Sequence, residues 1–339
     1  MVVPSSRTFG WNHFALASAA VTALAIGDVI ILGFNLGGDR FAIAVDDMGS
    51  AVAAFIAGAA CAWTARRSVG RFRSGWALMA ASAAAWGIGE IVWCVYEVVL
   101  NIAVPFPSGA DAGYLLAVPL AIAGVLCFRT APRGTAQRWR LWLDALPIAL
   151  ALTFTGWSLG LQQVELSAGT VTERGVLLAY PVGDILVATV LILGIRRATR
   201  IHHGRMLLLL AGLAANAIAD TAFAYMTADG VYPTLLIDSG WVVGYLAIAL
   251  AALWPLERAD RAADEKPVDL WQIALPWAAV LTAGATALFV VLRGQSTDQF
   301  QTVLAVAMVS LLAISEVVIP WWVTWRAGPQ SDPHLDRTV

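Results

Sequence analysis

The chain has 339 residues, of which 59% are hydrophobic and only 13% are charged, and its mean hydropathy is +0.74. A soluble domain has about 45–50% apolar and about 25% charged residues, so this chain has too few polar side chains to cover a globule in water. The composition excludes a soluble globular domain and predicts an integral protein of the lipid bilayer. The net charge of -2 says nothing about partners, but the sequence has no basic face, so we expect no nucleic-acid partner.

Ten apolar stretches are candidates to cross the bilayer, which takes about 20 mostly apolar residues. They do not alternate as barrel strands do, and backbone groups in lipid must be satisfied within the segment, so we expect helices. In chain order they cover residues 11–34, 49–65, 75–100, 111–128, 140–162, 176–195, 206–226, 236–255, 270–292 and 299–325. The first stretch follows Arg7 and is interpreted as an uncleaved signal anchor.

The arginines predict the orientation. Of the 21 Lys and Arg residues, only Arg40, Arg174 and Arg293 fall on one side of the predicted helices. By the positive-inside rule the other side is cytoplasmic, and it holds both termini, residues 1–10 and a polar tail or linker at 326–339. The predicted fold class is therefore all-α and polytopic: about ten transmembrane helices in the cell membrane, N-in and C-in. They form five tandem parallel hairpins, at about 11–66, 75–128, 140–195, 206–255 and 270–325.

An acid recurs along these hairpins. It follows a small–apolar–small step in three stretches, at Gly27-Asp28, Gly89-Glu90 and Ala219-Asp220, and another acid lies at or near the start of the next stretch. The acids of this repeat are Asp28, Asp47, Glu90, Asp111, Asp184, Asp220 and Asp238, with Glu97 close to Glu90. An ionised acid at bilayer depth costs at least about 2.5–3.5 kcal/mol. Because no Arg or Lys shares that depth, we expect these acids to be protonated, hydrogen-bonded or exposed to a water-filled outer cavity.

Two interpretations of the acids stay open. Asp111 and Asp238 stand where they could cap helix N-termini, and the mid-helix acids could bond to neighbouring helices. Alternatively the acids share a polar pocket, carried mainly by the first, third, sixth and seventh predicted helices. The repeat places equivalent positions at Trp157 and Thr286, where an acid is absent.

Aromatic residues lie at the same level as the acids. They are interpreted either as an interfacial belt or as part of the pocket, where aromatic faces and carboxylates suit a cationic or amphipathic small ligand from the outer side. The candidate ligand-binding residues are Asp28, Glu90, Glu97, Asp111, Asp184, Asp220, Asp238, Trp93, Tyr114, Tyr180, Tyr225 and Trp241.

Catalytic and metal-binding motifs are missing from the sequence. There is no nucleophile elbow, phosphate loop or His-Glu-x-x-His sequence, and Cys61, Cys94 and Cys127 have no metal-ligand spacing. We therefore expect no catalytic residues, no metal, no cofactor and no enzymatic activity.

Several strings carry a family resemblance. They are Trp86-Gly-Ile-Gly-Glu90-Ile-Val-Trp93, Pro105-Phe-Pro-Ser-Gly-Ala-Asp111-Ala-Gly-Tyr114, Tyr180-Pro-Val-Gly-Asp184 and Ala219-Asp220-Thr-Ala-Phe-Ala-Tyr225, followed by Trp241-Val-Val-Gly-Tyr245. Over about residues 10–325 the chain resembles the multi-helix membrane input domain that precedes GGDEF and EAL modules in actinobacterial cyclic-di-GMP signalling proteins. The resemblance implies a sensory role with an output enzyme after the last helix. This chain departs from that pattern, because it ends shortly after that helix; it is expected to be a stand-alone relative or the excised membrane part, and no cyclase or phosphodiesterase activity is carried over.

Three functions are compatible with these patterns. The first is a membrane sensor or signal-input module that couples ligand or proton binding in the outer pocket to a cytoplasmic output. The second is a proton-coupled small-molecule transporter, which the parallel hairpins disfavour because many transporters have inverted repeats. The third is a non-catalytic subunit of a membrane complex, with a cytoplasmic or membrane protein as its partner.

Overall fold

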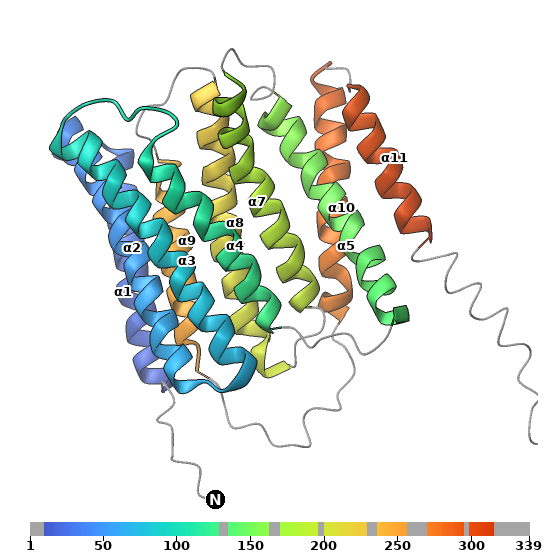
Figure 1. Ribbon diagram of the computed structural model, residues 1–339, viewed down its shortest axis with the longest axis horizontal. Coiled ribbons are helices and arrows are strands. Elements are labelled where there is room, and N and C mark those ends of the chain that lie inside the picture. Colours follow the sequence, from blue (N-terminus) through green and yellow to red (C-terminus); the bar gives the residue numbers. More distant parts are fainter. Residues whose placement is uncertain are drawn as a thin grey trace, which may run out of the picture.

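The computed structural model describes residues 10–128, 135–162, 170–195, 200–228, 236–255, 270–294 and 298–314. All regular structure in these ranges is helical, as predicted (Figure 1). The helices are α1 (Trp11–Gly33), α2 (Asp39–Arg67), α3 (Gly70–Cys94), α4 (Gly109–Phe128), α5 (Thr135–Gly156), α7 (Val171–Ile195), α8 (Arg200–Ala228), α9 (Ser239–Leu253), α10 (Leu270–Leu292) and α11 (Gln299–Ala313). Two π-helical turns, η1 (Val95–Val99) and η2 (Trp157–Leu161), extend α3 and α5.

Six of these helices, α1, α2, α3 with η1, α4, α7 and α8, are long and apolar enough to cross a membrane, and shorter apolar helices accompany them. Large apolar side chains also point outward, such as Leu16 (70% exposed) on α1 and Leu281 (70% exposed) on α10. Such a surface would be unstable in water and suits lipid. The chain is therefore a polytopic all-α membrane protein. The predicted tail and residues 315–325 lie outside the described residues.

Six helices pack in a closed ring. Each contacts its two neighbours in the order α2, α3, α4, α7, α8, α9 and back to α2. Helix α1 lies outside this ring, against α9 and α2, and Asp28 is its only buried residue. Helices α10 and α11 each pack on α5, which in turn packs on α7, and Figure 1 shows this group at one edge of the bundle. The ring order could not be read from the hairpin pattern.

Small residues set the spacing inside the ring between α3 and α4. A Cβ added to Gly113 would lie 2.6 Å from the Ala85 carbonyl oxygen and 2.8 Å from the Gly89 nitrogen. A Cβ at Gly89 would lie 2.9 Å from the Ala110 carbonyl oxygen. Glycine at both positions lets the two backbones touch, as small residues do at membrane helix interfaces. The small–apolar–small step before Glu90 therefore has a packing function.

The two ends of the bundle differ in charge. We call the end with Arg66, Arg67, Arg71 and Arg73, at the turn between α2 and α3, the arginine end, and the opposite end, where α2, α4 and α9 begin, the acidic end. One arginine is buried inside the ring near the arginine end. Arg205 is 5% exposed and donates hydrogen bonds to the carbonyl oxygens of Ala252 and Trp254, both at 3.2 Å. Thr64 donates to the same Ala252 oxygen at 2.7 Å, so α2, α8 and α9 are joined there.

Candidate functional site

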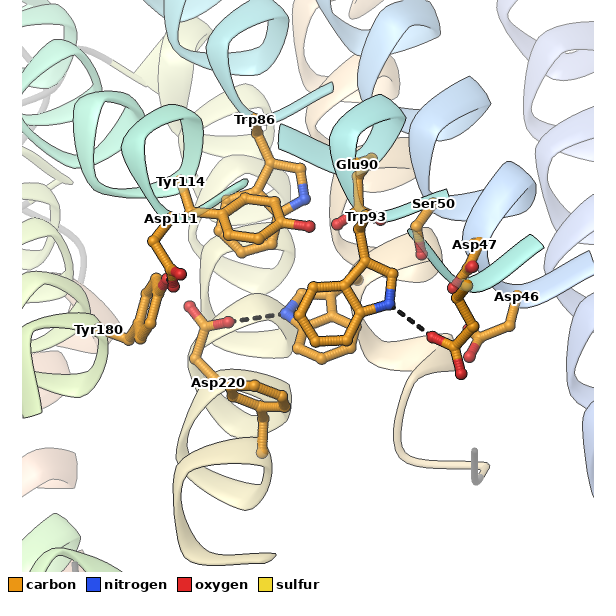
Figure 2. Close-up of a pocket in the computed structure, with 13 residues that line it drawn as sticks. Asp46, Asp47, Ser50, Trp86, Glu90, Trp93, Asp111, Tyr114, Tyr180 and Asp220 are labelled. Carbon is orange, nitrogen blue, oxygen red and sulfur yellow. Dashed lines mark hydrogen bonds between the residues drawn. The ribbon is translucent and has the colours of Figure 1, made fainter. Parts of the chain in front are cut away.

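A cavity lies inside the ring near the acidic end, and all six ring helices contribute to its wall (Figure 2). Its volume is about 40 Å³, counted over the centres of the water molecules that fit. This is room for about three waters. The lining residues are Asp46, Asp47, Ser50, Trp86, Glu90, Trp93, Glu97, Asp111, Tyr114, Tyr180, Asp220, Phe223 and Trp241.

Helix α2 supplies three buried polar residues to the wall. Asp46, Asp47 and Ser50 are 8%, 6% and 2% exposed, although they lie on a helix of a membrane protein. Asp47 Oδ2 and Ser50 Oγ have no hydrogen-bond partner among the described residues. A buried polar group without a partner costs about 1–3 kcal/mol. These two atoms therefore retain unused hydrogen-bonding capacity in the cavity wall.

Helix α3 and the π-helical turn after it form a second wall. Glu90 is 6% exposed, and Trp93 Nε1 donates to Glu97 Oε2 at 2.8 Å, a bond drawn as a dashed line in Figure 2. The turn from α3 into η1 separates Trp93 from Glu97 by four residues, which keeps both on one side of the helix. Single π-helical turns within helices are frequently found at functional sites.

Asp111 serves both the start of α4 and the cavity. Its Oδ2 accepts from the Ser108 backbone N–H at 2.5 Å, while Ser108 Oγ accepts from the Ala110 N–H at 3.2 Å, which is a capping-box arrangement. Its Oδ1 accepts a hydrogen bond from the Tyr180 hydroxyl of α7. Asp111 therefore both bonds to the backbone at the start of α4 and lines the cavity.

Helices α8 and α9 close the ring. Trp241 Nε1 donates to Asp220 Oδ1 at 2.7 Å, the second dashed line in Figure 2. Phe223 stands edge-on to Trp93, with ring centroids 6.0 Å apart, and also contacts Trp241 at 6.1 Å. Trp86 packs at 4.6 Å on Tyr114. Aromatic rings thus fill the space between the acids.

The wall carries an excess of acidic residues. Six of its residues are acids, and no Lys or Arg is among the described residues that line it. No three of the described His, Cys, Asp and Glu side chains are grouped so that they could hold a metal ion. The acids are spread around the ring, and indole and phenol donors stand between them. This arrangement can hold a small molecule that carries positive charge or several hydrogen-bond donors.

A second cavity, also of about 40 Å³, adjoins the first on the side of the arginine end. The two cavities share Trp86 and Asp220 in their walls. Asp184 and Asn216 line the second cavity, and Asp184 Oδ2 and Asn216 Oδ1 have no hydrogen-bond partner among the described residues. Asp184, expected in the same pocket as the other acids, therefore lies one compartment further along the ring.

Three other expected residues do not line the first cavity. Asp28 is buried, with its Oδ1 3.4 Å from the place of a Cβ at Gly49 on α2, and α1 contributes nothing to the cavity wall. The expectation that the first helix carries the pocket is wrong, because α1 lies outside the ring. Asp238 occupies the N-cap position of α9 without any side-chain cap bond, so that capping prediction is also wrong, and the residue is fully buried. Tyr225 is 40% exposed, away from the cavity.

Some residues of the cavity wall are not among the ligand-binding residues predicted from the sequence. Asp47 belonged to the acid repeat but was not chosen as a ligand residue, and Asp46 stands beside it. Ser50 and Phe223 carried no signal that separates them from ordinary membrane residues. An acid of the fifth hairpin reaches the position in the third where the repeat lacks one: Trp157 Nε1 donates to Asp298 Oδ2 at 2.8 Å. Asp298 precedes the last apolar stretch as Asp111 and Asp238 begin theirs, and that position could have revealed it.

No family model, no curated protein and no solved structure matches this chain. Function is therefore inferred from the geometry of the ring and its cavity.

Proposed function

We propose that this protein is a signal-input domain of the cell membrane that binds a small molecule in the cavity at its acidic end. The observation that supports it best is that all six ring helices contribute to the cavity wall, with Asp47 Oδ2 and Ser50 Oγ buried and without partners among the described residues. The proposed orientation places the acidic end outside and the arginine end in the cytoplasm, following the positive-inside rule. The family resemblance of the sequence agrees with a sensory role.

The ring offers a physical route for a signal. A ligand shifts a conformational equilibrium only if it binds two packings of the protein with different affinity. Since every ring helix contributes to the cavity wall, a bound molecule contacts all six at once. Trp86 and Asp220 line both this cavity and the second one, and Arg205 joins three ring helices further toward the arginine end. A movement of the shared wall therefore changes packing toward the proposed cytoplasmic side.

The proposal is tested by purifying the intact chain in mild detergent and identifying bound small molecules and proteins by mass spectrometry. We expect a small molecule that co-purifies with the wild type and is lost from Glu90→Gln. Asp39→Asn is the matched control, because Asp39 is exposed and bonds to Asn35 outside the cavity. A stoichiometric protein partner with no small molecule would instead indicate a subunit of a membrane complex.

A transporter is the second candidate, and one observation favours it. Trp86 and Asp220 line both cavities, and the second cavity lies toward the arginine end. A transporter would open the wall at these residues and pass its substrate from one cavity to the next. Substrate flux into proteoliposomes that collapses with Asp220→Asn would support transport over sensing.

A further inference from the structure

The hydrogen-bond acceptors that still lack a donor are unevenly distributed over the cavity wall. On the α3, α4, α8 and α9 sides, three acids already accept hydrogen bonds: Glu97 from Trp93, Asp220 from Trp241, and Asp111 from Tyr180 and Ser108. On the α2 side, Asp47 Oδ2 accepts none. Figure 2 shows Asp46, Asp47 and Ser50 together on one side of the cavity, across from Asp111 and Tyr180. The free acceptor capacity is therefore concentrated on α2.

Ser50 makes this side a two-point site. It follows Asp47 by three residues on the same helix, so both side chains lie on one face. Ser50 is 2% exposed, and its Oγ lacks a partner among the described residues. This observation does not depend on the charge of any acid. A group that donates two N–H bonds would satisfy both oxygen atoms.

The rest of the cavity favours a cation with an apolar part. No basic side chain is among the described lining residues, so an incoming cation meets six acids and no competing positive charge. The rings of Trp86, Trp93, Trp241 and Phe223 supply apolar surface and negative π-faces, which attract organic cations. A divalent metal is a poor occupant, because no three of the described ligand residues are grouped around one point.

The cavity volume limits the size of the occupant. About 40 Å³ of water-centre space corresponds to about three waters, or about 90 Å³ of liquid water. A short chain with one charged nitrogen fits that space.

We propose that the acidic-end cavity binds a small primary alkylammonium ion, with its N–H groups on Asp47 and Ser50 and its alkyl chain against the tryptophans. This inference rests on the binding site of the proposed function, but it does not require that binding be coupled to a signal.

The test uses the full chain in mild detergent, titrated by calorimetry with n-propylammonium chloride. Three control compounds are titrated at the same concentration and ionic strength: the neutral isostere 1-propanol, sodium propionate and potassium chloride. We expect saturable binding of propylammonium alone. We also expect Asp47→Asn to weaken binding by about tenfold or more, since a charge-assisted hydrogen bond is lost, and Ser50→Ala to weaken it less. Asp39→Asn, the same substitution in the same helix outside the cavity, should bind like the wild type.

Four results would overturn the inference: no saturable binding of propylammonium to the wild type, equal binding of 1-propanol, equal competition by potassium, or the same loss in Asp39→Asn as in Asp47→Asn. If Asp47→Asn does not fold, Ser50→Ala decides, because its removal of one hydroxyl leaves the helix packing in place. Wild-type affinity in folded Ser50→Ala would then contradict the two-point site.

The two proposals fail separately. A neutral molecule that co-purifies and is lost from Glu90→Gln would support the receptor and overturn the cation. Propylammonium binding that leaves the arginine end unchanged would support the cation and overturn the signalling function.

Discussion

The contact between α3 and α4 is a place where a single methyl group should disrupt the ring. In Gly113→Ala, the new Cβ would lie 2.6 Å from the Ala85 carbonyl oxygen, 2.8 Å from the Gly89 nitrogen and 3.0 Å from the Gly89 Cα. All three are backbone atoms of a neighbouring helix, so no side chain can rotate away to make room. Overpacking of this kind costs about 1–3 kcal/mol, and we expect the free energy of unfolding to fall by that amount.

The measurement is reversible unfolding of the purified chain in detergent, followed by circular dichroism. Gly27→Ala is the matched control, because nothing lies within 4 Å of the added Cβ on α1. Alanine has a helix propensity about 1 kcal/mol better than glycine, so this control should be as stable as the wild type or slightly more stable. Equal stability of Gly113→Ala and Gly27→Ala would refute the close packing of α3 on α4, and with it the closed ring.

Three further predictions concern the cavity and its orientation. Trp241→Phe removes the hydrogen-bond donor to Asp220 and should lower the free energy of unfolding by about 1–3 kcal/mol. The control Trp277→Phe, at a 40% exposed position on α10, should lower it little. Equal losses of stability in the two variants would contradict the buried bond. Protons compete with a cation for carboxylates, so the Kd for propylammonium should rise as the pH is lowered from about 8 to about 5. A Kd that decreases as the pH is lowered would contradict carboxylate binding. The orientation can be tested in a variant without the native cysteines, by adding a membrane-impermeant thiol reagent to intact cells. The reagent should label Leu36→Cys at the acidic end and should not label Val69→Cys at the arginine end. The reverse labelling pattern would contradict the proposed orientation.

Long apolar runs were sufficient to predict the helices. The described helices lie at the ten predicted stretches, because lipid leaves a long apolar segment no alternative to helix. The largest error is at α2, which begins at Asp39 and not near residue 49. Asp46 and Asp47 interrupt the apolar run in the sequence, but in the structure they face the cavity and not lipid. A charged residue marks the end of a transmembrane helix only where its side chain would have to face hydrocarbon.

Part of the predicted site lines the cavity, and the position of Asp28 outside it has a clear cause. The acids on ring helices, such as Glu90 and Asp220, line the cavity, but Asp28 has the same local pattern and does not. The sequence repeat describes each helix, while membership of the site depends on which helices close the ring. That order is set by tertiary contacts such as Gly113 against Ala85, which the sequence of a single helix does not encode.

The most direct test of the account is hydrogen exchange of the intact chain in detergent, with and without saturating propylammonium. The account predicts slower exchange of the backbone around residues 46–50, which contact the ligand, and also a change at the arginine-end turn around residues 67–70. Protection at residues 46–50 with no change at the turn would contradict a signal-input function. No change at either place would contradict ligand binding in the cavity.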